Sequence, residues 1–165
     1  MSMSDVPAIE PAWLHGHPHD PNPAPPSEEP TFVVKQSNGV EHTIRVEDLT
    51  RLPLTHVPDC WIVSTGHGRS GPFTFAGARL ADLLNSVLSP VVTWQQVDVI
   101  SADGFGTRLF AQEVLDPTLT RPILLSYAIH ETPMTRRQGL VRLIVPSETD
   151  DALRQVKWVG RIEIA

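Results

Sequence analysis

The most constraining feature of this chain is the way its apolar residues are grouped. From residue 31 onward they form short runs with β-branched and aromatic residues, and turn residues such as Asn, Asp, Gly and Pro separate the runs. Residues 78–88 instead carry leucines at the i, i+3 and i+4 spacing of an amphipathic helix. Strands and helices do not alternate regularly, as a doubly wound sheet would require. The pattern predicts an α+β fold, a mixed β-sheet domain with few short helices.

The expected elements can be placed along the chain. Asn38 and Gly39 stand between two β-branched runs and predict a hairpin, because this dipeptide tolerates positive φ at both turn positions. Residues 59–64 predict a buried strand that a glycine-rich loop follows. Shorter helical segments are expected at 46–52 and 112–122. Further strands are expected at 94–101, 107–111, 123–131, 140–146 and 157–164.

The first 30 residues differ in composition from the rest of the chain. They contain eight of the sixteen prolines and almost no contiguous apolar residues, so they bury too little surface to offset the entropy of ordering. We expect a disordered, Pro-rich tail at 1–30 before a single domain at 31–165. His15, His17 and His19 alternate beside Asp20, a spacing that suits a divalent ion, although a solvated tail lacks the rigid surroundings of a metal site.

Charge and cysteine content limit the partners of the chain. A net charge of -6 argues against nucleic acid and anionic membranes, so a small molecule or a protein is the expected partner. The sequence contains no apolar run long enough to span a membrane and no N-terminal export signal. We therefore expect a cytoplasmic location. Cys60 is the only cysteine, too few for an iron–sulfur cluster. A redox reaction would therefore need an external electron carrier, and we expect a monomer or a small homo-oligomer.

Residues 64–70, with the sequence STGHGRS, stand between an expected strand and the helix at 78–88. A loop placed in this way commonly presents residues to a ligand. His67 lies between two glycines, which favours exposure to solvent or ligand, and Arg69 is suited to an anion. Near the C-terminus, Trp158 is expected in the core and Lys157 on the opposite face of the same strand.

Five short motifs follow one another along the chain. They are Phe75 to Leu84 (FAGARLADLL), Asp103-Gly104-Phe105, Leu125-Ser126-Tyr127, Gly139 with Arg142-Leu143 and Pro146, and Lys157-Trp158-Val159 with Arg161-Ile162. Together they resemble the molybdopterin-binding domain of the sulfite oxidase family over roughly residues 35 to 165. The resemblance implies that family's fold and a molybdenum-molybdopterin cofactor.

In that family, the segment before the helix carries the cysteine whose thiolate binds molybdenum. The segment at 64–70 matches the family's glycine at Gly66 and its arginine at Arg69, but Ser64 stands where the cysteine is expected. Cys60 lies four residues earlier, roughly 13 Å away in an extended strand. Ser64 is the favoured position for the metal ligand, and a second register that makes Cys60 the ligand stays open.

The resemblance also implies roles for the remaining candidate residues. His67 and Tyr127 join Ser64 and Cys60 as catalytic candidates. The candidates for binding the pterin phosphate or an anionic substrate are Gly66, Arg69, Arg142, Arg154 and Lys157. With the cofactor retained, the domain is an oxidoreductase that acts on a small anion.

The departures from the family pattern support an alternative. Serine is a harder and less ionised donor than a thiolate, and larger or acidic residues replace expected glycines before Lys157. These departures are what loss of the cofactor would produce. The alternative is a cofactor-free domain of the same fold that binds or transforms an organic ligand, or acts as an interaction module.

Overall fold

The computed structural model describes residues 31–64, 68–102, 104–136, 138–146 and 155–165. The strands are β1 (Thr31–Lys35), β2 (Glu41–Arg45), β3 (Thr55–Ser64), β4 (Gly68–Arg79), β5 (Gln96–Ser101), β6 (Gly106–Phe110), β7 (Leu124–Ile129), β8 (Thr132–Pro133), β9 (Arg142–Ile144) and β10 (Val159–Ile164). The helices are α1 (Val46–Thr50), α2 (Leu80–Val87) and α3 (Ala111–Val114). The tail expected at 1–30 lies outside the described residues.

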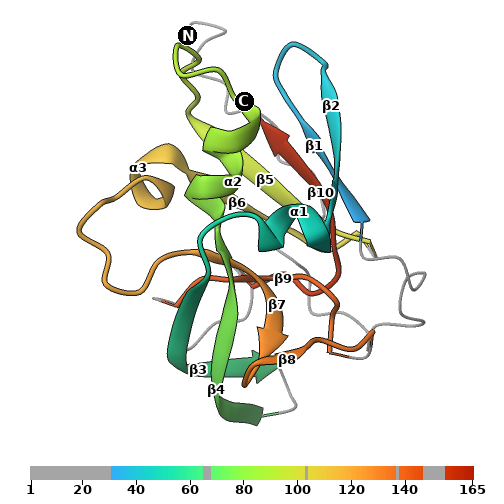
Figure 1. The fold of residues 1–165 in the computed structure, drawn as a ribbon, viewed down its shortest axis with the longest axis vertical. Helices are drawn as coiled ribbons and strands as arrows, with labels where there is room; N and C mark the ends of the chain where they lie inside the picture. Colours follow the sequence, from blue (N-terminus) through green and yellow to red (C-terminus); the bar gives the residue numbers. More distant parts are fainter. Residues whose placement is uncertain (1–30, 65–67, 103, 137, 147–154) are drawn as a thin grey trace, which may run out of the picture.

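The strands form two sheets. One has the order β2-β1-β10-β5-β6, and the other has the order β3-β4-β7-β8, with β9 paired to β7. Figure 1 shows the second sheet at the lower end of the molecule and β1, β2, β5 and β10 at the upper end. The first sheet is mixed, because β1 pairs parallel with β10 while the other three strand pairs of this sheet are antiparallel. These sheets and short helices confirm the predicted α+β class.

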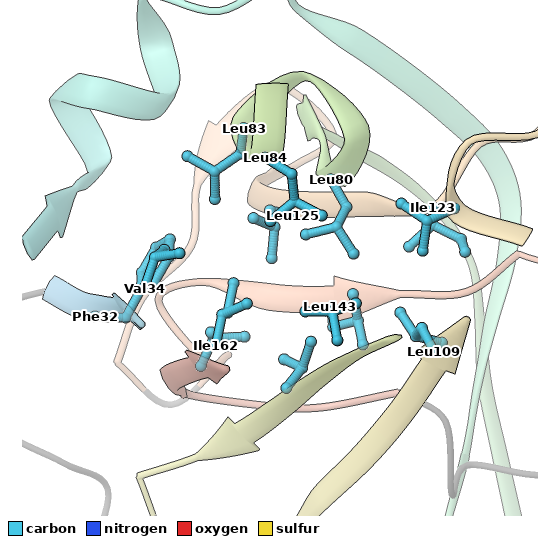
Figure 2. Close-up of a cluster of buried hydrophobic side chains, with 14 of the residues drawn as sticks. Phe32, Val34, Leu80, Leu83, Leu84, Leu109, Ile123, Leu125, Leu143 and Ile162 are labelled. Atoms are coloured by element: carbon cyan, nitrogen blue, oxygen red, sulfur yellow. The ribbon is translucent and has the colours of Figure 1, made fainter. Parts of the chain in front are cut away.

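The main core lies between the first sheet, α2, β7 and β9. Leu80, Leu83 and Leu84 point from α2 toward β7 and β10 side chains such as Leu125 and Ile162 (Figure 2). All five are at most 2% exposed, and full burial of one such side chain stabilises a fold by about 1.5–3 kcal/mol. The leucine spacing therefore predicted the helix and its buried face.

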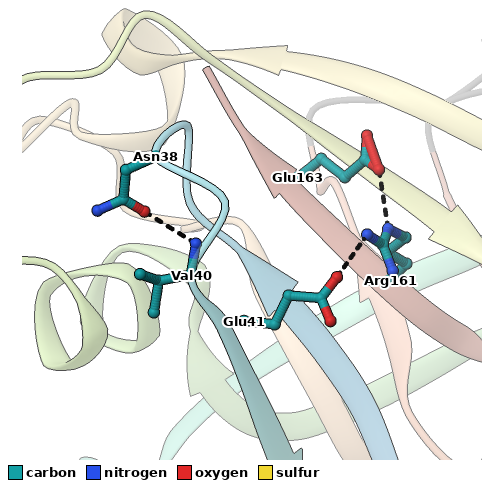
Figure 3. Close-up of polar contacts among 5 residues, drawn as sticks. All are labelled: Asn38, Val40, Glu41, Arg161 and Glu163. Carbon is teal, nitrogen blue, oxygen red and sulfur yellow. Dashed lines mark hydrogen bonds and ion pairs between the residues drawn. The ribbon is translucent and has the colours of Figure 1, made fainter.

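The hairpin predicted at Asn38 and Gly39 is confirmed. The Asn38 side-chain oxygen accepts a hydrogen bond from the Val40 backbone N–H at 2.9 Å, and Gly39 has a φ of 92° (Figure 3). Beside it, Arg161 of β10 binds Glu41 at 2.9 Å and Glu163 at 2.8 Å. The pair with Glu41 links β10 to β2 across β1, and the pair with Glu163 lies within β10.

The glycine-rich loop is shorter than the sequence predicts. Only residues 65–67 separate β3 from β4, and β4 pairs with both β3 and β7. The expected helix at 78–88 begins two residues later, at Leu80, because β4 extends to Arg79. Pairing on both sides outweighs the weak strand propensity of the glycines in β4.

No helix in the described part of the chain has both the length and the apolar character needed to cross a membrane.

Candidate functional site

A tight turn precedes β9. The Thr135 carbonyl accepts hydrogen bonds from the backbone N–H groups of Gly139, at 3.0 Å, and Leu140, at 3.1 Å. The Thr135 hydroxyl oxygen accepts another from the Gln138 N–H at 3.2 Å. Gly139 has a φ of 121° and Leu140 a φ of 59°, so both lie in the left-handed region. The turn brings the Gln138 carbonyl back toward the start of β9.

Arg142 is the first residue of β9 and is only 9% exposed. Its Nη1 donates a hydrogen bond to the Gln138 carbonyl at 3.1 Å, while its buried Nε has no partner among the described residues. Burial lowers the pKa of this guanidinium to about 10, so the group is charged at neutral pH. A buried charge with an unsatisfied donor is costly, and an anion would supply the missing acceptor.

Lys157 lies beside Arg142 because Val156 forms a bridge with Leu143 of β9. A Cβ added at Gly139 would lie 2.8 Å from the Arg142 Cγ and 2.9 Å from the Lys157 Cγ. Glycine therefore allows both basic side chains to pack against the turn. Two residues that the resemblance assigns to phosphate binding thus pack against the same glycine.

Trp158 and Lys157 follow one another directly, and the prediction for one of them is wrong. Trp158 is buried, at 4% exposed, as expected, and its indole N–H donates to the Arg136 carbonyl at 2.6 Å. The expectation that Lys157 points to the opposite face is wrong, since its Nζ lies 4.3 Å from the centre of the Trp158 ring. Trp158 has a φ of 54°, which breaks the alternation of an extended strand, and β10 begins only at Val159. We call Gln138, Gly139, Arg142, Lys157 and Trp158 the Arg142 cluster.

Sequence reasoning assigned no site role to Gln138 or Trp158. Gln138 contributes through its backbone carbonyl, and no residue-type pattern marks such a group. Trp158 follows Lys157 directly in the Lys-Trp-Val motif, which was the one signal in the sequence for its involvement.

Cys60 lies in a second core cluster with Val57, Phe75 and Ile144. Its thiol donates a hydrogen bond to the Val57 carbonyl at 3.4 Å, and Nη2 of Arg121 lies 3.5 Å from the sulfur. Burial raises the pKa of the thiol, although Arg121 acts in the opposite direction. A thiol in these surroundings is protonated at neutral pH and is a poor source of a thiolate ligand.

Ser64 and Arg69 lie on the two strands of the β3–β4 hairpin. Ser64 pairs with Gly68, and Arg69 pairs with Val63. This pairing places both backbones beside residues 65–67. Gly66, His67 and Arg154 lie outside the described residues, so their roles stay predictions, as do those of the Ser64 and Arg69 side chains.

Tyr127 lies at an irregularity in β7. Ala76 of β4 pairs with Ala128 and Gly77 pairs with Ser126, so Tyr127 has no partner across the ladder. Such a bulge changes the direction of a side chain, and bulges are frequent beside active sites. The Tyr127 side chain packs partly buried against the main core, and burial raises the pKa of its phenol. Its catalytic role stays a prediction.

The described donor groups suit one end of a molybdenum-pterin cofactor better than the other. The Arg142 cluster offers a buried positive charge and an unsatisfied N–H, which suit a phosphate group. At the metal end, the only thiol of the chain is buried, which raises its pKa, and the assignment of Ser64 to the family's ligand position stays a prediction. These residues therefore fit a phosphate but do not fit a thiolate-bound molybdenum.

The described residues thus form an α+β domain with a buried arginine whose Nε has no hydrogen-bond partner among them. The chain belongs to the oxidoreductase molybdopterin binding domain family, whose model matches residues 22–165. This membership confirms the resemblance to the sulfite oxidase type of domain.

A solved structure shares the fold. The crystal structure of the sulfane dehydrogenase SoxCD from Paracoccus pantotrophus matches with a TM-score of 0.61 and 18% sequence identity. The match covers 81% of this chain and 37% of that chain, so the domain spans just over a third of the SoxCD chain. No curated protein sequence is significantly similar to the chain.

Proposed function

We propose that this domain binds the phosphate end of a molybdopterin-type ligand, or of a related organic phosphate, at the Arg142 cluster. The observation that carries the proposal is the buried Arg142 guanidinium, whose Nε lacks a hydrogen-bond partner among the described residues. We further propose that the domain does not hold molybdenum through a thiolate.

The chemistry of the Arg142 cluster supports phosphate as the ligand group. A phosphate has several acceptor oxygens, so one can accept from the Arg142 Nε while others face the Lys157 ammonium group. Because Arg142 is buried, it lies in a region of low dielectric, where each charged contact is stronger. Phosphate would also offset the cost of burying the guanidinium.

A second candidate function follows from family membership. In this candidate, the domain is an oxidoreductase in which Ser64 or Cys60 binds the metal, His67, Arg69 and Tyr127 face a small anionic substrate, and an external carrier exchanges electrons. This candidate further proposes that the protein is cytoplasmic and is a monomer or a small homo-oligomer. Burial of Cys60, which raises the pKa of its thiol, argues against Cys60 as the metal ligand in this candidate.

Replacing Lys157 with Gln is expected to weaken binding of inorganic phosphate by about one to two orders of magnitude, the usual effect of losing a charge-assisted contact. Isothermal titration calorimetry measures the affinity, and thermal unfolding checks the fold. Lys35→Gln on β1 is the matched control, because it makes the same charge change outside the Arg142 cluster. If the two variants bind phosphate equally well, the Arg142 cluster is not the binding site.

A further inference from the structure

Trp158 connects the segment before β10 to the turn that precedes β9. Its indole N–H holds the Arg136 carbonyl at 2.6 Å, and Gln138, two residues further along the same turn, holds Arg142 Nη1 at 3.1 Å. The turn is thus anchored at both ends of this short segment. From this geometry we infer that Trp158 is a positioning residue, which fixes the turn and thereby the direction in which Arg142 presents its Nε. The inference rests on the proposed phosphate site.

The backbone of Trp158 supports this role. A φ of 54° is unfavourable for a bulky residue and costs about 1–3 kcal/mol, so the surrounding structure must hold it in place. Two hydrogen bonds do so on either side: the Trp158 carbonyl accepts from the Ala102 N–H at 2.8 Å, and the Val159 N–H donates to the Val141 carbonyl at 3.0 Å. Backbone strain of this kind concentrates at ligand sites, because a relaxed backbone would not direct the side chain correctly.

The Trp158 ring has a second contact in the cluster. The Lys157 ammonium group lies 4.3 Å from the ring centre, within the range of a cation–π interaction. Trp158→Phe keeps an aromatic face for Lys157 but removes the indole N–H. The substitution therefore tests mainly the link to the Arg136 carbonyl.

The experiment is a double-mutant cycle with four proteins: the parent, Trp158→Phe, Arg142→Lys and the double variant. Arg142→Lys keeps a positive charge, so residual phosphate binding stays measurable, but lysine lacks the guanidinium whose direction the turn controls. Calorimetry with inorganic phosphate gives the affinities, and thermal unfolding gives the stabilities. Trp94→Phe is the matched control. It is the same substitution at a tryptophan that packs against the main core and is not part of the Arg142 cluster.

We expect Trp158→Phe to weaken phosphate binding about tenfold in the parent, the usual effect of losing a hydrogen bond that acts on a charged group. In the Arg142→Lys background the same change should have little effect on phosphate affinity, although it still lowers the melting temperature. Trp94→Phe should change the melting temperature without changing the affinity. If Trp158→Phe does not fold, Trp158→Tyr replaces it in the cycle, because it fills more of the space and also lacks the indole N–H.

The outcomes separate this inference from the proposed function. Equal losses of affinity in both backgrounds, or no loss in the parent, would overturn the positioning role and leave the phosphate site intact. A loss of affinity in Trp94→Phe as large as that in Trp158→Phe would show a general effect of destabilisation and would also overturn it. A parent protein that does not bind phosphate would overturn both.

Discussion

Arg142→Met is expected to abolish phosphate binding and, in the ligand-free protein, to raise stability by about 1–3 kcal/mol. Arg142 is buried, keeps an unsatisfied Nε among the described residues, and has a pKa lowered to about 10 by burial. Methionine has a similar length and no charge to desolvate, so the change removes an unfavourable group from the folded state. Gln138 is exposed, so water can replace Arg142 as the hydrogen-bond partner of its carbonyl.

Urea unfolding with and without phosphate measures this result. Saturating phosphate should stabilise the parent, because a ligand that binds only the folded state shifts the equilibrium, and should not affect Arg142→Met. Arg108→Met is the contrasting control. Arg108 forms two hydrogen bonds with the nearly buried Asp98, at 2.7 and 3.0 Å, so its removal should lower stability without changing phosphate affinity. A large loss of stability in Arg142→Met would instead make Arg142 a structural residue.

Gly77→Ala is expected to destabilise the fold by at least about 3 kcal/mol, near the upper end for overpacking. A Cβ at this position would collide with the Leu125 carbonyl oxygen and lie 2.7 Å from the Ser126 Cα. Both are backbone atoms of β7, so no side chain can rotate away, and β4 would have to separate from β7. The Tyr127 bulge depends on the same close approach of the two strands.

Gly39→Ala is the control for Gly77→Ala. Gly39 has open space around its Cα but a φ of 92°, so alanine there should cost only about 1–2 kcal/mol of backbone strain. The free energy of unfolding in urea gives both values. If Gly77→Ala costs no more than Gly39→Ala, then the pairing of β4 with β7 at Gly77 is incorrect.

The sequence predicted elements whose signals are local. Asn38 and Gly39 predicted the first hairpin, because the turn requires residues that accept positive φ. The spacing of Leu80, Leu83 and Leu84 predicted α2 and its buried face. In both cases the residues that form the signal also make the stabilising contacts.

Strand β4 could not be predicted in the same way. Its glycines serve contacts with other strands: a Cβ at Gly71 would lie 2.7 Å from the Cys60 carbonyl oxygen, and one at Gly77 would collide with β7. Glycine is read as a loop residue in a single sequence, since the contacts that require it are made with other strands and are not visible there.

The site was predicted in part. Family resemblance named Arg142 and Lys157, and the structure brings them together around Gly139. The relation between Lys157 and Trp158 was predicted wrongly, because strand alternation assumes an extended backbone and Trp158 has a φ of 54°. The indole contact with a backbone carbonyl depends on that conformation, which the sequence does not reveal.

We propose that this family member binds a phosphate ligand and holds no molybdenum through a thiolate. Elemental analysis by mass spectrometry tests it most directly, with the absorption spectrum alongside, on three proteins from a host that makes molybdopterin: the parent, Ser64→Cys and Cys60→Ser. We expect the parent to contain far less than one molybdenum per chain, Ser64→Cys to contain more, and Cys60→Ser to match the parent, because the Cys60 thiol is buried and protonated. Stoichiometric molybdenum in the parent that disappears in Cys60→Ser would contradict the account and make Cys60 the metal ligand.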